Sequence, residues 1–220
     1  MKNAFKISLL ALALLSANAQ AATQRLDGAY FDVIYDDSKL GLFGDLELAG
    51  NTLLFSPYEF VAESTSKRWD IARSTFSFWI EADAGHHLAG ATLIEGGDYG
   101  LLGKSADAFV AGETRVVDMR TPSVSRDVDL AVSCDPATSV ALANWQAVST
   151  QTFASGASKV RFTIENMLFA SAGSKTGYSV IEKKYASLTV SAVPEPESYA
   201  MLLAGLGIIG AVVRRRKTAA

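Results

Sequence analysis

The sequence predicts an all-β protein, a single antiparallel β-sandwich of the jelly-roll or Ig-like kind, flanked by an N-terminal signal peptide and a single C-terminal transmembrane helix. Two observations on the central part predict the sandwich. Apolar and polar residues alternate there with a period of two, and turn residues separate these stretches at intervals of roughly 8 to 15 positions. No central stretch keeps the i, i+3, i+4 pattern of an amphipathic helix over several turns.

The first predicted strands lie near the start of the central region. In residues 30–35, Phe31, Val33 and Tyr35 share one face of an extended chain. Residues 52–55 follow a Gly-Asn turn signal and end before a proline. Further strands with the same alternation are expected at 75–81, 88–94, 108–110, 114–119, 160–164 and 185–190.

Three breaks divide these later strands. Residues 82–85 predict the turn of a hairpin, so that Phe76, Phe78 and Ile80 lie on one face and Trp79 on the other. A glycine-rich segment at 96–100 predicts another turn. We expect a further hairpin centred on Gly112.

The central region has the composition of a folded, acidic domain. The chain has 220 residues, of which 49% are hydrophobic and 20% charged, enough apolar material for one globular domain. The leader holds two of the 20 basic residues and the tail four, while the tail holds two of the 23 acidic ones, which leaves 14 basic and 21 acidic residues. A net charge of −7 without a basic stripe repels phosphate backbones, so nucleic acid is excluded as a partner.

Residues 1–21 have the three parts of a secretory signal peptide. The first six residues carry two positive charges, Lys2 and Lys6, and residues 7–15 are uncharged and mostly apolar. Ala19 and Ala21 each have an alanine two positions earlier, which gives the small residues at −3 and −1 that signal peptidase requires. The apolar run is too short to span a bilayer, which needs about 20 residues. The sequence therefore predicts export through the Sec translocon and cleavage after Ala19 or Ala21.

The C-terminal segment, residues 193–220, has three parts in a fixed order. Pro194, Glu195 and Pro196 come first and favour an extended, accessible backbone. Residues 199–213 carry no charge and predict a short transmembrane helix, and the basic cluster at 214–217 holds its end on the cytoplasmic side through Arg214, Arg215 and Arg216. The domain at 22–192 would then face outward, held by a temporary anchor.

This tail resembles the PEP-CTERM sorting domain, whose name comes from the motif that Pro194, Glu195 and Pro196 match. The resemblance implies recognition and removal of the tail by an exosortase, a membrane-embedded enzyme, in a Gram-negative bacterium that produces exopolysaccharide or biofilm. It implies nothing about the central domain, because this tail is attached to many unrelated domains. An anchor that is never cut is the alternative.

The central region offers few candidates for chemistry. It has no nucleophile elbow, zinc-protease motif or phosphate-binding loop, so we assign no catalytic residue and no cofactor. Calcium is the one metal that the acidic pairs would suit, at Asp36 and Asp37 or at Asp127 and Asp129. Solvated turns are the alternative for both pairs.

Aromatic, histidine and cysteine side chains complete the candidates. Exposed rings could stack on sugars. His86 and His87 are adjacent, so on a strand they would point to opposite faces and could not chelate one ion; a hairpin tip is expected there. Cys134 has no partner for an internal disulfide and is expected to be buried, with an intermolecular bridge as the alternative. The aromatic candidates are Trp69, Trp79, Trp145, Tyr58 and Tyr99.

The sequence thus predicts an exported surface or matrix protein, non-enzymatic and associated with exopolysaccharide. A secreted glycan-active hydrolase or a carbohydrate-binding module is the first alternative. A periplasmic ligand carrier with a deep apolar pocket is the second.

Overall fold

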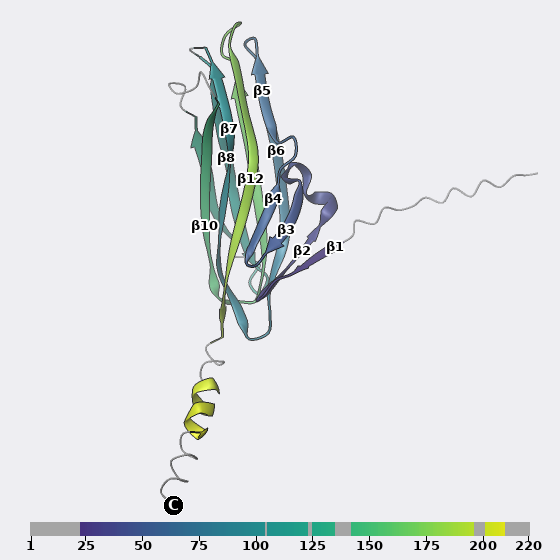
Figure 1. Ribbon diagram of the computed structural model, residues 1–220, viewed down its shortest axis with the longest axis vertical. Helices are drawn as coiled ribbons and strands as arrows, with labels where there is room; N and C mark the ends of the chain where they lie inside the picture. The colour runs from purple at the N-terminus through teal and green to yellow at the C-terminus, as the bar shows by residue number, and fades with distance from the viewer. Residues whose placement is uncertain (1–22, 104, 123–124, 135–141, 196–200, 210–220) are drawn as a thin grey trace, which may run out of the picture.

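The computed structural model describes residues 23–103, 105–122, 125–134, 142–195 and 201–209 (Figure 1). Within them the chain is mostly β-strand, in two antiparallel sheets, with one α-helix at 201–209. The other elements, in chain order, are β1 (Thr23–Asp27), β2 (Phe31–Asp36), the 3-10 helices η1 (Asp37–Lys39) and η2 (Gly41–Phe43), β3 (Asp45–Ala49), β4 (Thr52–Ser56), β5 (Val61–Thr65), β6 (Trp69–Ala82), β7 (His86–Leu102), β8 (Asp107–Asp118), β9 (Ser125–Ser133), β10 (Ala143–Ala157), β11 (Lys159–Ser171) and β12 (Tyr178–Pro194).

From β5 onward, consecutive strands lie in opposite sheets, except for the β8-β9 hairpin, whose two strands lie in one sheet. One sheet has the order β1-β2-β6-β11-β8-β9 and is here called the β6 sheet; the other, the β12 sheet, has the order β10-β7-β12-β4-β3, with β5 also paired to β12. Strands β5 to β12 therefore form two four-stranded sheets, with the orders β5-β12-β7-β10 and β6-β11-β8-β9. This is the strand order of a jelly roll. The hairpins β1-β2 and β3-β4 extend the two sheets.

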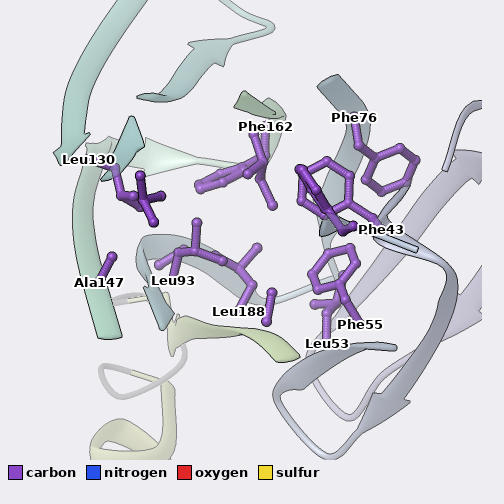
Figure 2. Packing of buried hydrophobic residues seen from close by; sticks show 14 of the residues in the cluster. Phe43, Leu53, Phe55, Phe76, Leu93, Leu130, Ala147, Phe162 and Leu188 are labelled. Atoms are coloured by element: carbon purple, nitrogen blue, oxygen red, sulfur yellow. The ribbon is translucent and has the colours of Figure 1, made fainter. Parts of the chain in front are cut away.

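The core lies between the two sheets (Figure 2). Phe76 and Phe162 from the β6 sheet face Leu93 and Leu188 from the β12 sheet, and all four side chains are fully buried. The alternation visible in the sequence produces this arrangement, because every second side chain of a strand points inward. Full burial of a side chain of this size stabilises the fold by about 1.5–3 kcal/mol.

The predicted strands exist, but several are longer than expected. The expected turn at 96–100 lies inside β7, and Gly112 lies inside β8, so both of these turn predictions were wrong. Close packing explains the glycines: a Cβ atom on Gly97 would stand 1.9 Å from the carbonyl oxygen of Glu182, and one on Gly112 would stand 2.1 Å from that of Glu165. These glycines permit neighbouring strands to approach and do not turn the chain.

The C-terminal helix at 201–209 exposes its apolar side chains. It covers only part of the transmembrane segment predicted at 199–213, whose other residues lie outside the described ranges. Among the residues that the structure describes, no helix has the length and apolar character needed to cross a membrane. The signal peptide predicted at 1–21 also lies outside these ranges.

Candidate functional site

The sorting motif begins inside the last strand. Pro194 is the final residue of β12 and pairs with His86 of β7, and the backbone N–H of Glu195 donates to the carbonyl of Gly85 at 2.8 Å. We expected an extended segment separate from the strand, with the sorting segment starting at 193. A proline has no backbone N–H to donate, so it suits a strand position that is paired on one side only. β12 pairs with β4 only as far as Thr189, and among the described residues Pro194 pairs with β7. Pro196, Arg214, Arg215 and Arg216 lie outside the described residues.

A surface groove of about 870 Å³ lies where the chain crosses from β2 to the β12 sheet. Its walls come from η1 and η2 on one side and from the segment after β4 on the other. Gly44, with a φ of 70°, closes one wall against the carbonyl oxygen of Ser56, where a Cβ atom would stand at 1.8 Å. The lining residues are Asp37, Ser38, Leu40, Gly41, Gly44, Asp45, Ser56, Pro57 and Tyr58.

The groove brings two predicted candidates together, Asp37 of the first acidic pair and the aromatic Tyr58. Tyr58 is 71% exposed, so its side chain is accessible to a ligand. Asp37 and Asp45 make this region acidic: the pKa of Tyr35 nearby is raised by its burial and then by these two carboxylates. An exposed ring beside carboxylates can stack on a sugar and accept hydrogen bonds from its hydroxyl groups.

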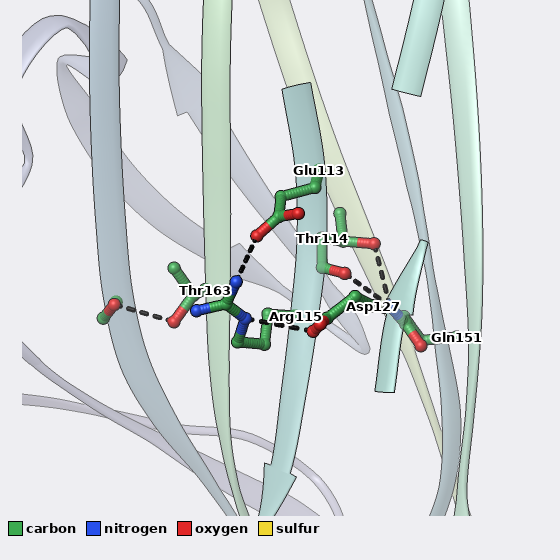
Figure 3. A network of polar contacts seen from close by, with 7 residues as sticks. Glu113, Thr114, Arg115, Asp127, Gln151 and Thr163 are labelled. Carbon is green, nitrogen blue, oxygen red and sulfur yellow. Dashed lines mark hydrogen bonds and ion pairs between the residues drawn. The ribbon is translucent and has the colours of Figure 1, made fainter. Parts of the chain in front are cut away.

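One carboxylate of each predicted calcium pair is engaged by neighbouring protein groups. The Asp36 carboxylate caps η1, accepting from the backbone N–H of Ser38 at 3.0 Å and from its hydroxyl at 2.6 Å. Asp127 accepts from Arg115 at 3.0 Å, and the same guanidinium donates to Glu113 at 2.5 Å (Figure 3). Nowhere in the described ranges do three or more acidic, histidine or cysteine side chains gather as ligands.

The other aromatic candidates divide between core and surface. Trp145 is buried and its indole N–H donates to the Glu182 carbonyl at 3.0 Å, and Tyr99 is also buried. Trp69 is 66% exposed. Trp79 lies on the outer face of β6, as its position out of phase with Phe78 predicts, and is half-buried.

The histidine pair and the cysteine have structural surroundings. His86 and His87 begin β7 directly after a turn, as expected, and the ring of His86 lies 4.9 Å from that of Tyr30 between centroids. Cys134 is buried as predicted, and burial, with a contribution from the charge of Asp107, raises the pKa of its thiol to about 12. A buried, protonated thiol does not exchange disulfides readily.

The sequence reasoning missed a buried polar triad formed by Lys183, Glu95 and Asn166. Lys183 (β12) and Glu95 (β7) come from one sheet and Asn166 (β11) from the other, and the side chains of Lys183 and Glu95 are fully buried. The Lys183 Nζ lies 2.5 Å from Glu95 Oε2 and also contacts Asn166 Oδ1. Asn166 Nδ2 donates to Glu95 Oε1 at 2.9 Å, which closes a ring of three contacts.

The surroundings of the triad are apolar. The Lys183 Nζ stands 5.4 Å from the ring centroid of Phe43 and 5.0 Å from that of Phe60, and both rings are buried. Burial lowers the pKa of Lys183, while Glu95 acts in the opposite direction. One feature of the sequence could have indicated the burial of Lys183: it lies two residues after Ile181, so on a strand both side chains point to the same, inward face.

Comparison with known proteins assigns the tail and not the domain. No curated protein matches the chain. Residues 192–217 match the family model of the PEP-CTERM protein-sorting motif, a range that contains both the Pro-Glu-Pro motif and the arginine cluster. The chain therefore carries a PEP-CTERM sorting signal, which implies an exported protein that is sorted by an exosortase.

Proposed function

We propose that this protein is a non-enzymatic component of the cell surface or extracellular matrix of a Gram-negative bacterium, where it associates with exopolysaccharide in a biofilm. The single observation that carries the proposal is the sorting-motif match at 192–217. In this proposal residues 1–21 are removed after Sec export, and residues 199–213 hold the protein in the inner membrane until exosortase acts.

The junction between β12 and the motif suits such processing. β12 ends at Pro194, and the last described contact of the motif is the Glu195 backbone bond to Gly85. A cut on the C-terminal side of the motif would leave every strand pair of β12 in place. The released domain would therefore keep its fold, and its new C-terminus would project from one end of the sandwich (Figure 1).

Terminal peptide mapping of the protein recovered from its producer tests this proposal. We expect an N-terminus after Ala19 or Ala21 and a C-terminus within 194–197. Glu195→Ala should retain residues 199–220 and stay in the membrane fraction, because the exposed Glu195 side chain belongs to the matched motif. Ser191→Ala, at an exposed position of β12 outside the match, is the control. Wild-type protein that keeps its tail in the membrane would contradict processing.

The groove favours a second candidate, a carbohydrate-binding module. Tyr58→Ala should abolish retention on the producer's exopolysaccharide, whereas Tyr58→Phe should preserve it, because stacking needs the ring and not the hydroxyl. Trp69→Ala is the matched control, since Trp69 is similarly exposed and lies outside the groove. Equal retention of all variants would exclude the groove, and release of reducing ends from the polysaccharide would favour a hydrolase.

A further inference from the structure

We propose that Lys183 and Asn166 become joined by an isopeptide bond, formed between Lys183 Nζ and Asn166 Cγ with loss of ammonia, and that Glu95 transfers the protons. The bond would link the two sheets through the core. Nothing outside the folded domain is needed as reagent, because the amine, the amide and the proton carrier are all present in the triad.

The positions of the three side chains match the requirements of this reaction. Lys183 Nζ contacts Asn166 Oδ1, and because Cγ is bonded to Oδ1 at about 1.2 Å, the amine stands beside the carbon that it would attack. Glu95 bridges the nucleophile and the leaving group: Oε2 lies 2.5 Å from Lys183 Nζ, and Oε1 accepts from Asn166 Nδ2 at 2.9 Å.

The apolar surroundings favour the reactive protonation state. A lysine attacks only as a neutral amine, and transfer of one proton from the ammonium to Glu95 leaves both groups uncharged. Burial against Phe43 and Phe60 disfavours two separate charges, and it lowers the pKa of Lys183. Burial also keeps out the water that would compete for the amide.

The atoms and charges balance in the following steps. Glu95 first takes a proton from the Lys183 ammonium, and the neutral Nζ then attacks Cγ, which places the carbonyl electron pair on Oδ1. Glu95 gives its proton to Nδ2 and accepts one from Nζ. The carbonyl re-forms, the Cγ–Nδ2 bond breaks and ammonia leaves, so that the products are a secondary amide, ammonia and a protonated Glu95.

The local backbone is built to bring these groups together. The register of β12 against β7 shifts between Lys183 and Tyr185, and Gly97 of β7 faces Lys183 at that position, where a Cβ atom would meet the Lys183 Cα at 3.0 Å. In the other sheet Gly112 pairs with Asn166, and a Cβ atom there would stand 2.9 Å from Asn166 Nδ2. Both partners of the proposed bond thus lie opposite glycines in their neighbouring strands.

A bond at this place would protect the strand that leads to the sorting motif. β12 connects the core to Pro194, and any load on the processed C-terminus would pass along it. The bond would fasten β12 to β11 of the opposite sheet, so β12 could not be pulled away beyond Lys183 without breaking a covalent bond. This consequence does not depend on which glycan or partner the domain meets.

The test is mass spectrometry of the protein recovered from its producer, denatured and digested with trypsin. We expect a branched peptide that joins the segment containing Asn166 to the segment containing Lys183, lighter than the sum of the two by the mass of ammonia, about 17 Da. Trypsin should not cut after Lys183. Separate peptides of full mass, with cleavage after Lys183, would overturn the proposal. So would a loss of the mass of ammonia that maps to another residue, such as Gln20, which would be N-terminal after cleavage at Ala19.

Two variants separate the chemistry from folding. Glu95→Gln keeps the shape of the side chain but cannot carry the proton, so we expect its two peptides unlinked and of full mass. Lys184→Gln changes the exposed neighbour and should remain fully cross-linked. If Glu95→Gln fails to fold, the wild-type peptide map still decides whether the bond exists. A cross-link that forms equally in folded Glu95→Gln would refute the role of Glu95.

Discussion

Replacing Gly97 by alanine should destabilise the domain more strongly than a single added methyl group normally does. The new Cβ atom would stand 1.9 Å from the Glu182 oxygen, 2.8 Å from its carbonyl carbon and 3.0 Å from the Lys183 Cα. These are backbone atoms of β12, which β5 holds from its other side at Glu182. Since no side chain can rotate away, we expect a cost at the upper end of the range for overpacking, about 3 kcal/mol.

The matched control is Gly100→Ala on the same strand. There a Cβ atom would meet side-chain atoms of Leu142 and Val180 at 3.3 and 3.4 Å, so the expected cost is below about 1 kcal/mol. Urea unfolding of the processed protein, followed by tryptophan fluorescence, measures both. A cost of about 3 kcal/mol corresponds to a melting point lowered by about 6–12 °C for Gly97→Ala. A free energy of unfolding within 1 kcal/mol of the control would refute the close-packing explanation of these glycines.

Three further predictions concern single side chains. Cys134 should not react with a thiol reagent in the native protein at pH about 8 and should react fully in denaturant, because burial raises the pKa of its thiol to about 12. Burial raises the pKa of Asp118, but the hydrogen bonds and the charge of Arg120 together outweigh burial, so the pKa is lowered overall. The stability that Asp118 adds relative to Asp118→Asn should therefore be present above about pH 4 and be lost as the pH falls below it. Arg115→Ala should cost less than about 1 kcal/mol in urea unfolding, since its ion pairs are partly exposed.

The sequence was most informative where one strand face is buried. Alternation identified the inner parts of β2, β4, β6 and β11, because a period of two follows directly from strand geometry. It was least informative at glycines. Gly97 and Gly112 have the same appearance in the sequence as turn residues, and only the neighbouring strand shows that they permit close approach.

The candidate sites could be predicted only in part, because they depend on contacts between distant segments. Asp37 and Tyr58 were separate candidates, and the groove that unites them exists only because the chain crosses from one sheet to the other between β2 and β3. Lys183 belongs to a lysine pair in which only Lys184 is exposed: Lys183 keeps the inward phase of Ile181, and the register shift of β12 comes after it, before Tyr185. Glu95 and Asn166 gave no local signal of their own.

The proposed isopeptide bond would explain why a polar triad that includes Lys183 of β12 is buried in the core. A buried ion pair is weak evidence for stability, since well-packed apolar residues at the same place are often equally stabilising or more so. Here the Lys183 Nζ lies beside the buried rings of Phe43 and Phe60, where an apolar replacement would pack readily. The strand that bears Lys183 is also the one that ends at Pro194 and carries the exported domain's sorting signal. A domain held or joined through its C-terminus is loaded along this strand, and a covalent link between the sheets resists that load in a way that side-chain packing alone does not.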